Sequence, residues 1–391
     1  MSWQPRRLDE LGSVSRGRSR HRPRDAAHLY GGPHPFIQTG DVKHAGLYIT
    51  DYTQTYSHAG LEQSKLWPAG TLCITIAANI ADTAILGIDA CFPDSVIGFN
   101  ADPHQADARF VKYLFDATIK HRAQQFSQGA TQDNLSQEKL LSLEFNIPGV
   151  DEQTRIADML STYDDLIENN RRRMALLEES ARLLYREWFV CLRFPGHEHT
   201  RIIDGVPEGW ERKSLGELAN ITMGQSPESK FYNETGEGLP FHQGVADFCD
   251  RFVKHRIYCS VQNRIAEAGD ILCSVRAPVG RLNITMDKIV IGRGLAALRS
   301  KTGNQSLLFQ QLRAHFFKED LIGAGAIFAS VTKKEFEAQK ILNPTAPLAT
   351  AFEEVTSQID EQLRVLTLQN QKLRTARDLL LPRLMSGELP V

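Results

Sequence analysis

The most regular hydrophobic pattern in the chain lies in residues 151–189, which contain neither proline nor glycine. Apolar residues recur there at alternating spacings of four and three, and this pattern predicts one long helix with a coiled-coil seam. The seam residues are Ile156, Leu160, Tyr163, Ile167, Asn170, Met174, Leu177, Ala181, Leu184 and Trp188. An equivalent seam, 196 residues further along, comprises Phe352, Thr356, Ile359, Leu363, Leu366, Asn370, Leu373, Arg377, Leu380 and Leu384. Pro382 is expected to kink or end this second helix.

Two asparagines, Asn170 and Asn370, occupy seam positions. A polar residue in a seam lowers stability but restricts the register and orientation of the paired helices. Each helix of about 39 residues would be roughly 58 Å long, which is more than a domain core needs, so the pair is interpreted as a spacer. A coiled coil between two chains is also compatible with the seam, but its repetition favours an antiparallel pair within one chain.

The chain repeats itself on the scale of a whole domain. The segment Trp3–Ser19 shares its leading Trp and several Leu, Glu, Gly and Ser positions with Trp210–Ser226. Further on, Pro35–Gln38 is echoed by Pro240–Gln243, and from Gly129 the match continues without a gap. A repeat of about 200 residues is too long for a solenoid unit. It indicates two copies of one domain, each followed by a long helix.

Each copy is predicted to mix strands and helices. Short apolar runs bounded by Gly and Pro predict strands at Thr71–Ala77, Ile271–Val275 and Lys288–Ile291. Helices are predicted at Ala108–Gln125 and Gln305–Glu319, and Ser136 and Thr332 are candidate N-caps, the latter with Glu335 in a capping box. The expected fold class is α+β: two globular mixed α/β domains separated by two long antiparallel coiled-coil helices, with a pseudo-two-fold internal repeat. The expected domains are residues 1–150 and 201–345, and the spacer helices lie in 151–200 and 346–391.

Composition limits the class of protein without giving a function. Of the 391 residues, 42% are hydrophobic and 24% are charged, which is typical of globular domains. There is no apolar run long enough to cross a membrane and no secretory leader, and the six cysteines lack metal-binding or disulfide spacing, so we expect a cytoplasmic protein. The net charge of −2 does not indicate nucleic-acid binding, but residues 1–24 carry seven arginines. These form either a solvated, partly disordered arm or a phosphate-contacting arm.

Motifs for catalysis are missing from the sequence. A methyltransferase acting on exocyclic amines needs an Asn/Asp-Pro-Pro-Tyr/Phe loop, and the nearest strings, Asn146–Gly149 and Asn343–Ala346, do not match it. There is also no Gly-x-x-x-x-Gly-Lys-Ser/Thr phosphate loop and no His-Glu-x-x-His zinc motif. We therefore expect a binding protein with no catalytic residue and no metal site.

Polar, glycine-bearing loops at equivalent places in the two copies are the candidate nucleic-acid contacts. Arg, Gln and Ser side chains are common donors to base edges and phosphates, and Gly would allow the backbone to approach closely. The candidates in the first copy are Arg16, Gly17, Arg18, Ser19, Gln38, Thr39, Asn79, Thr131 and Gln132. The candidates in the second copy are Gln225, Ser226, His242, Gln243, Arg276, Arg281 and Ser330.

Several segments resemble the DNA-specificity subunits of type I restriction–modification systems. Asp151–Asn170 and Leu177–Tyr185 resemble the central region of those subunits, and Ala376–Leu389 resembles their C-terminal region. Gly129–Ser136 and Val275–Gly280 are similar to parts of their recognition domains. The resemblance implies two target-recognition domains, each reading one half of a split site in double-stranded DNA. Since the loops differ between the copies, the two half-sites should differ as well.

The resemblance also implies partners that carry the chemistry. Two modification subunits would bind S-adenosylmethionine and methylate adenine, and restriction subunits that use ATP and Mg would complete an endonuclease. No cofactor is expected in this chain itself. Two other interpretations stay open from the residues alone: a standalone bipartite DNA-binding or coiled-coil adaptor protein, and an enzyme with an unrecognised nuclease or methylase site.

Overall fold

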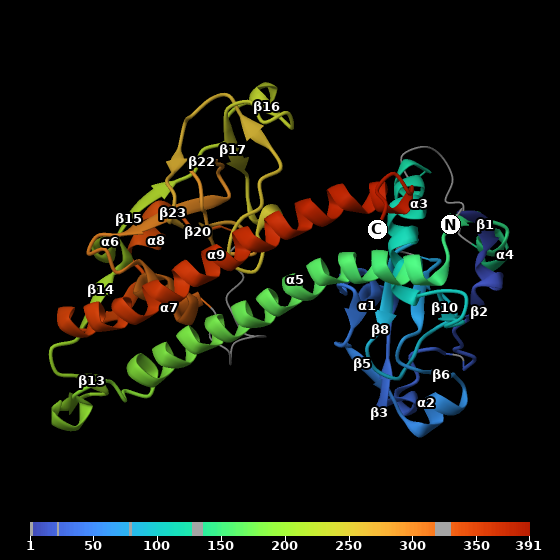
Figure 1. Cartoon of the computed structure of the whole chain (residues 1–391). Helices are drawn as coiled ribbons and strands as arrows, with labels where there is room; N and C mark the ends of the chain where they lie inside the picture. The colour runs from blue at the N-terminus through green and yellow to red at the C-terminus, as the bar shows by residue number, and fades with distance from the viewer. Residues whose placement is uncertain (1–2, 22, 78–79, 127–135, 317–329) are drawn as a thin grey trace. The chain divides into compact units, whose positions relative to one another are not determined.

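The computed structural model describes residues 3–21, 23–77, 80–126, 136–316 and 330–391, and only the backbone of residues 120–126. The chain forms two compact units: unit 1 comprises residues 1–172 and 367–391, and unit 2 comprises residues 173–366. Both units mix strands with helices. The long helices α5 (Val150–Tyr185) and α9 (Ala346–Met385) each contribute one segment to each unit (Figure 1).

Unit 1 is built on a five-stranded sheet. Its strand order is β2 (Gly12–Arg16), β10 (Val96–Ala101), β7 (Leu72–Thr75), β8 (Thr83–Leu86) and β4 (Tyr48–Ile49). Every residue of β7 and β8 is buried, because the sheet is covered on both faces. A second sheet has the order β5 (Gln54–Tyr56), β3 (Tyr30–Phe36), β9 (Ala90–Cys91) and β6 (Leu66–Trp67), and β1 (Gln4–Arg7) pairs with β11 (Glu144–Ile147). The helices of this part are α1 (Thr39–His44), α2 (His58–Glu62), α3 (Ala108–Phe126) and α4 (Gln137–Leu141).

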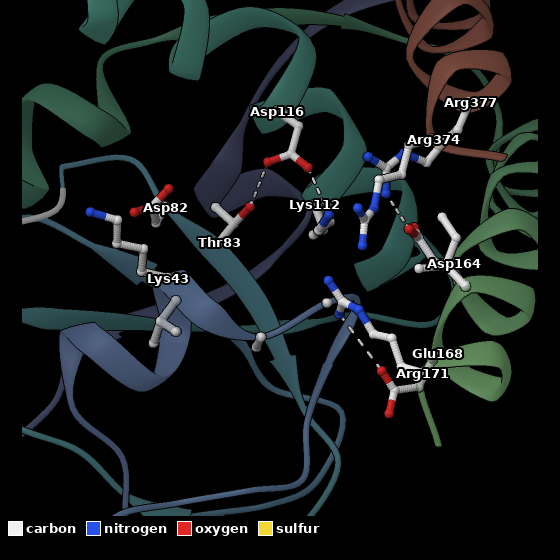
Figure 2. Close-up of a pocket in the computed structure, with 14 residues that line it drawn as sticks. Lys43, Asp82, Thr83, Lys112, Asp116, Asp164, Glu168, Arg171, Arg374 and Arg377 are labelled. Atoms are coloured by element: carbon white, nitrogen blue, oxygen red, sulfur yellow. Dashed lines mark hydrogen bonds and ion pairs between the residues drawn. The ribbon is translucent and has the colours of Figure 1, made fainter. Parts of the chain in front are cut away.

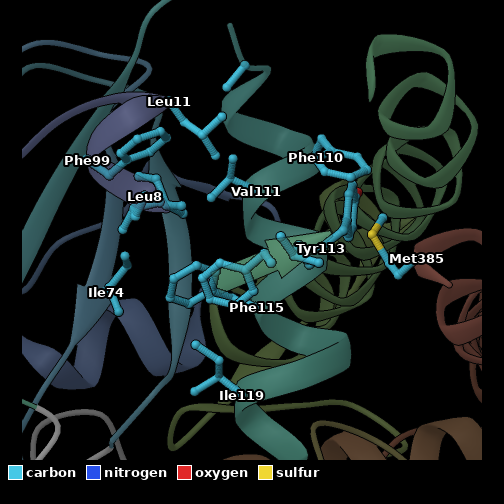
Figure 3. Close-up of a cluster of buried hydrophobic side chains, with 14 of the residues drawn as sticks. Leu8, Leu11, Ile74, Phe99, Phe110, Val111, Tyr113, Phe115, Ile119 and Met385 are labelled. Atoms are coloured by element: carbon cyan, nitrogen blue, oxygen red, sulfur yellow. The ribbon is translucent and has the colours of Figure 1, made fainter. Parts of the chain in front are cut away.

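The core of unit 1 lies between the central sheet and α3. Figure 3 shows Val111 and Phe115 of α3 facing Leu8, Ile74 and Phe99, and all five side chains are buried. Met385, in the last turn of α9, belongs to the same cluster. Full burial of one such side chain stabilises a fold by about 1.5–3 kcal/mol. The end of α9 is therefore an integral part of unit 1.

Unit 2 repeats this arrangement. Its central sheet has the order β15 (Ala219–Met223), β23 (Leu295–Ser300), β20 (Ile271–Ser274) and β21 (Leu282–Ile284). The second sheet has the order β16 (Tyr232–Asn233), β18 (Tyr258–Cys259), β17 (Leu239–His242), β22 (Ile289–Ile291) and β19 (Ile265–Ala266). Strands β14 (Glu211–Ser214) and β24 (Lys340–Asn343) pair as β1 and β11 do, and β12 (Ile202–Ile203) and β13 (Val206–Pro207) form a hairpin. The helices are α6 (Leu215–Leu218), α7 (Gln305–Phe316) and α8 (Lys333–Glu337). The internal repeat predicted from the sequence is confirmed.

The locally coded elements agree with the sequence. Ser136 caps α4 by accepting a hydrogen bond from the backbone N–H of Lys139, and Thr332 and Glu335 form a capping box on α8. The predicted strands are present but one to three residues shorter than expected. The predicted helix from Gln305 is present up to Phe316, and residues 317–319 lie outside the described part.

The two long helices pair in antiparallel fashion within each unit. In unit 1, Asn170 bonds to Asn370 and Asp164 bonds to Arg377, so the residue numbers rise on α5 as they fall on α9. In unit 2 the ring of Tyr185 lies 6.1 Å from that of Phe352, and Met174, Leu177, Ile359 and Leu363 join one hydrophobic cluster. Every predicted seam residue is buried or half-buried. Pro382 does not end α9, which continues to Met385, although proline has no N–H and so removes one backbone hydrogen bond there.

In its described residues, 3–21 and 23–24, the arginine-rich N-terminal segment is not a disordered arm, contrary to that part of the expectation. Residues 4–7 and 12–16 are strands of two different sheets. Arg6 is held by Glu10, and Arg24 makes a 2.8 Å ion pair with Asp94. The arginines at positions 6, 7 and 16 are therefore part of folded structure, because strand pairing with distant segments fixes their backbone.

Candidate nucleic-acid interface

One end of the central sheet of unit 1 gathers three connections. Strand β2 ends at Arg16 opposite Ile97, and β7 ends at Thr75 opposite Val96. The residues that continue these strands, together with the turn before β10, therefore lie along one edge. We call residues 16–19, 76–82 and 92–95 loop edge 1; residues 78–79 within it are outside the described part of the chain.

The corresponding end of the central sheet of unit 2 has the same construction. Strand β15 ends opposite Ala296, and β20 ends opposite Leu295. We call residues 224–226, 275–281 and 292–294 loop edge 2. The backbone N–H of Gly17 donates to the carbonyl of Val96 (2.8 Å), and that of Gly224 donates to Leu295 (2.9 Å). The two edges are thus built by equivalent hydrogen bonds.

The glycines of the two edges serve the fold. A Cβ atom on Gly17 would lie 2.3 Å from the carbonyl oxygen of Pro93, and one on Gly224 would lie 2.1 Å from that of Gly292. Such distances exclude any side chain unless the backbone shifts. Glycine at these positions lets two segments of the same unit approach each other, so the expectation that Gly17 serves a close approach to DNA is corrected.

Some of the candidate side chains of loop edge 1 are buried or form hydrogen bonds within the protein. Arg18 donates from Nε and Nη2 to the carbonyl oxygen of Ser64 at 2.9 and 2.6 Å. Ser19 is buried, so its expected contact with DNA is also corrected. Arg16 is exposed and uses Nε for the carbonyl oxygen of Asp94 (3.0 Å), which leaves its terminal nitrogens on the surface.

The other candidates of unit 1 are divided between α1 and undescribed residues. Gln38 is the N-cap of α1 and donates from Nε2 to Oε1 of Gln54 (2.6 Å), and Thr39 is half-buried in the first turn. Asn79, Thr131 and Gln132 lie outside the described residues.

Loop edge 2 presents an exposed polar cluster. The hydroxyl of Ser226 donates to Oε1 of Gln243 (2.8 Å) and accepts from the backbone N–H of Arg293 (3.1 Å). Gln225 and Gln243 are exposed beside it, and so is Arg293. Ser226 therefore orders two neighbouring segments, while the amides and the guanidinium remain available to a ligand.

Two further arginines lie on the connection from β20 to β21. The backbone N–H of Arg281 donates to Oγ of Ser274 (2.9 Å), which closes this turn. Arg276 makes a β-bridge with Ser330, and all three of Arg276, Arg281 and Ser330 are exposed. The segment that follows the undescribed residues 317–329 thus returns to loop edge 2.

His242 is inside unit 2, so the expectation that it faces DNA is corrected. Its side chain is 0% exposed and its Nε2 lies 2.9 Å from Nδ1 of His255, which in turn reaches Asp287. Burial, together with the neighbouring His255, lowers the pKa of His242 to about 4. The neutral imidazole therefore supports the backbone beneath Gln243.

Sequence reasoning missed Arg293 and its counterpart Asp94. Both occupy the turn before the first strand-paired residue, Val96 in unit 1 and Leu295 in unit 2. The offset between them is 199 residues, the same as between Ala69 and Ala268. Had the offset of 199 residues at Ala69 been extended along the chain, it would have aligned Asp94 with Arg293. The offset of 196 residues, which holds from Gly129 onward, does not align them.

The two edges carry opposite charges at equivalent positions. Asp82 in loop edge 1 corresponds to Arg281 in loop edge 2, and Asp94 corresponds to Arg293. Ala77 corresponds to Arg276. Among the described residues, loop edge 2 is therefore the more cationic surface.

In the part of the chain that the structure describes, no three His, Cys, Asp or Glu side chains are grouped so that they could hold a metal ion. Of the helices described, none combines the length and apolar character needed to cross a membrane.

Comparison with known proteins identifies the family. The model of the type I restriction modification DNA specificity domain matches residues 1–179 and 207–353. The chain is 26% identical to the MjaIX specificity subunit of a type I restriction enzyme of Methanocaldococcus jannaschii, over 100% of this chain and 94% of that subunit. It is 31% identical to the MjaX specificity subunit of the same organism, over 68% of this chain and 63% of that subunit.

A solved structure supports the fold. The S subunit of a type I restriction–modification system from M. genitalium aligns with a TM-score of 0.62 at 18% identity, covering 98% of this chain and 96% of that one. At this identity the likeness concerns the fold. Because the family model matches both halves of the repeat, the chain belongs to the family of type I restriction–modification DNA-specificity proteins.

Proposed function

We propose that this chain is the subunit that reads a bipartite site in double-stranded DNA, one half with each loop edge. Proteins of its family specify DNA and are not themselves catalytic. One observation carries the proposal: the same backbone construction presents different exposed side chains at the same end of two repeated sheets. A scaffold kept constant under variable side chains is suited to reading two different sequences.

The side chains that we propose as contacts are exposed, except those of Gln38 and Thr39, which are half-buried. Arginine forms bidentate pairs with guanine, and glutamine forms them with adenine. In loop edge 2 these would be Gln225, Gln243, Arg276 and Arg293, with Arg281 and Ser330 beside them. In unit 1, Arg16 is proposed from loop edge 1, and Gln38 and Thr39 from α1. Asn79, Thr131 and Gln132 stay predictions.

The domain limits follow the same proposal. Residues 1–150 and 201–345 would be the two recognition domains, and the helices in 151–200 and 346–391 would be the spacer between them. The start of α5 at Val150 and of α9 at Ala346 supports these limits.

We further propose that the long helices bind two modification subunits. In unit 1 the exposed Met159 and Leu166 lie seven residues apart on α5, and in unit 2 Leu176, Leu183 and Val190 repeat that spacing. Four of these five residues directly precede a seam residue, so a second apolar stripe runs beside the seam. Such a stripe is suited to further helix packing. S-adenosylmethionine would belong to those subunits, ATP and Mg to restriction subunits, and the whole assembly to the cytoplasm, where the chromosome is.

A domain exchange tests the proposal. Residues 1–150 are replaced by the corresponding domain of a related subunit, and adenine methylation is mapped by sequencing genomic DNA from cells that also express the modification subunits. One half of the methylated motif should change and the other should stay the same. Deleting the gene should abolish the motif. If both halves change together, each unit does not read its own half-site.

The isolated chain gives a second test. Incubated alone with target DNA and S-adenosylmethionine, it should transfer no methyl group, whereas the co-purified complex should. Labelling of DNA by the chain alone would contradict a purely reading role.

A further inference from the structure

Polar groups that bond to one another inside the fold are not free to read a ligand. The polar pocket of unit 1 is lined by such groups (Figure 2). Nζ of Lys112 lies 2.7 Å from the carboxylate of Asp116 there. Across the same pocket, Arg377 bonds to Asp164. The amide of Gln243, beside loop edge 2, differs from them because the fold holds only one of its two ends.

The oxygen end of this amide is held from two sides. Oε1 of Gln243 accepts a hydrogen bond from the hydroxyl of Ser226 (2.8 Å). The same oxygen lies against the backbone of the buried Gly292, where an added Cβ atom would be 2.7 Å from it. Glycine at position 292 therefore makes room for the carbonyl end of the amide, and this end faces the protein.

The hydroxyl of Ser226 favours one orientation of the amide. A hydroxyl has one proton to donate and lone pairs with which to accept. The backbone N–H of Arg293 donates to Oγ of Ser226 (3.1 Å), and the hydroxyl proton of Ser226 goes to Oε1 of Gln243. If the amide were turned around, its amino group would face the hydroxyl, and the hydroxyl proton would lose this acceptor.

The backbone around the amide is fixed as well. The N–H of Gly292 donates to the carbonyl oxygen of His242 (2.8 Å), and that of Gly294 donates to the carbonyl oxygen of Gln243 (3.2 Å). The turn before β23 is thus attached to the strand end that carries the amide. Gln243 is exposed, and its Nε2 has no partner among the described residues. The amino group is therefore the end that a ligand can reach.

We infer that Gln243 reads guanine through its amino group, with Ser226 as the positioning residue. In the major groove, guanine presents two acceptors, N7 and O6, whereas adenine presents the acceptor N7 beside the donor N6. A glutamine with both ends of its amide free pairs with adenine. An amino group with two protons, whose oxygen is turned toward the protein, matches two acceptors instead. The inference rests on the proposed function and refines it for this residue.

The equivalent glutamine of unit 1 is held by its other end. Gln38 donates from Nε2 to Oε1 of Gln54 (2.6 Å). Ser19, the counterpart of Ser226, is buried, and its hydroxyl lies 3.5 Å from that of Tyr56. The same residue type is therefore oriented differently in the two units, and we expect the two glutamines to prefer different bases.

The test uses the full chain in complex with its modification subunits, and duplexes that carry the methylated motif. In the half-site that stays the same in the domain exchange, each guanine is replaced in turn by 7-deazaguanine, which lacks the N7 acceptor. Each adenine is replaced by 7-deazaadenine in the same way. At one guanine the wild type should lose about five-fold or more in affinity, the lower end for a good base contact. Gln243→Ala should show no loss at that same guanine.

Exchange of that guanine for adenine tests the role of Ser226. The wild type should bind the adenine duplex about 5- to 150-fold more weakly. In Ser226→Ala the amide can turn and present both ends, so most of this preference should disappear. Ser226→Thr retains the hydroxyl and should retain the preference. Ser229→Ala is the matched control, because Ser229 is exposed in the same segment and its hydroxyl has no partner among the described residues.

Two results would overturn the inference. The first is that no guanine, or an adenine, is the base whose loss of N7 matters only when Gln243 is present. The second is that Ser226→Ala weakens both duplexes equally and keeps the preference for guanine, as expected if Ser226 has only a structural role. A failure of the proposed function has a different signature: the wild-type complex itself would not distinguish the motif from an unrelated duplex.

Discussion

Replacing the buried asparagine pair of unit 1 with leucine tests whether the long helices sacrifice stability for a fixed register. Nδ2 of Asn170 donates to Oδ1 of Asn370 at 2.9 Å, and Nδ2 of Asn370 reaches the carbonyl oxygen of Ile167 at 3.4 Å. The two side chains are 7% and 4% exposed. Each amide therefore depends on the other for its best hydrogen bond.

The magnitudes follow from this geometry. Asn170→Leu leaves Oδ1 of Asn370 buried without its donor, which costs about 1–3 kcal/mol of the free energy of unfolding. Asn370→Leu leaves Nδ2 of Asn170 in the same situation, at a similar cost. The double variant removes both polar groups and buries two apolar side chains, so it should be neutral or more stable than the wild type. The coupling between the two sites should thus exceed about 1 kcal/mol.

The assay is a double-mutant cycle. Urea unfolding gives the free energies, and hydrogen exchange of the α5 amides in unit 1 shows whether the effect is local. Asn169→Leu is the control: Asn169 is exposed on the same helix, and the change should stay within about 0.5 kcal/mol. Additive single effects in the cycle would refute the interpretation of the pair as mutually dependent. A double variant that is much less stable than either single variant would refute it too.

Three further variants test unit 2 and the spacer. Arg251→Ala should destabilise unit 2 by about 3–5 kcal/mol in urea unfolding, because Arg251 is 3% exposed and leaves Asp360 without its cation; a change under about 0.5 kcal/mol would contradict this. The pKa of His242 is about 4, below its ordinary value of 6.5, so folding loses up to about 3 kcal/mol as the pH falls from 6.5 to 4. His242→Ile, which copies Ile37 of the first copy, should flatten that part of the pH–stability curve, and an unchanged curve would assign the effect elsewhere. Inserting one heptad into each long helix adds about 10 Å of helix and should lengthen the unread spacer of the methylated motif by about three base pairs. An active protein with an unchanged spacer would show that the helices do not set it.

The elements that were predicted well from the sequence are those determined by residues close together in the chain. The seam repeats every seven residues, and the capping residues Ser136 and Thr332 act on a backbone N–H three positions away. Such signals need no knowledge of the tertiary fold. The same is true of the repeat, because two copies of one domain preserve the spacing of their anchors.

The candidate site was harder to predict, because its members meet only through strand register. Nothing local shows that Arg18 will reach the carbonyl of Ser64, or that Gly17 will pack against Pro93. The arginines of the N-terminal segment therefore suggested contacts with a ligand, whereas Arg18 bonds within the protein itself. Arg293 was missed for the converse reason: only the pairing of β23 with β15 and β20 brings it to the edge.

The loop edges are suited to reading DNA because backbone groups close their turns, while the side chains at the same positions differ. Thr75 closes its turn through the backbone of Asp82 at 3.0 Å, and Ser274 closes the equivalent turn through Arg281 at 2.9 Å, although the two closing residues carry opposite charges. Because each turn is closed through the backbone N–H of this residue, the closing hydrogen bond does not depend on the sign of its side-chain charge. Substitution at such positions should therefore alter what is bound before it alters stability. The positions that the turn does use, including Gly17 and Gly224, should behave in the opposite way, since any Cβ there meets a carbonyl oxygen of the same unit.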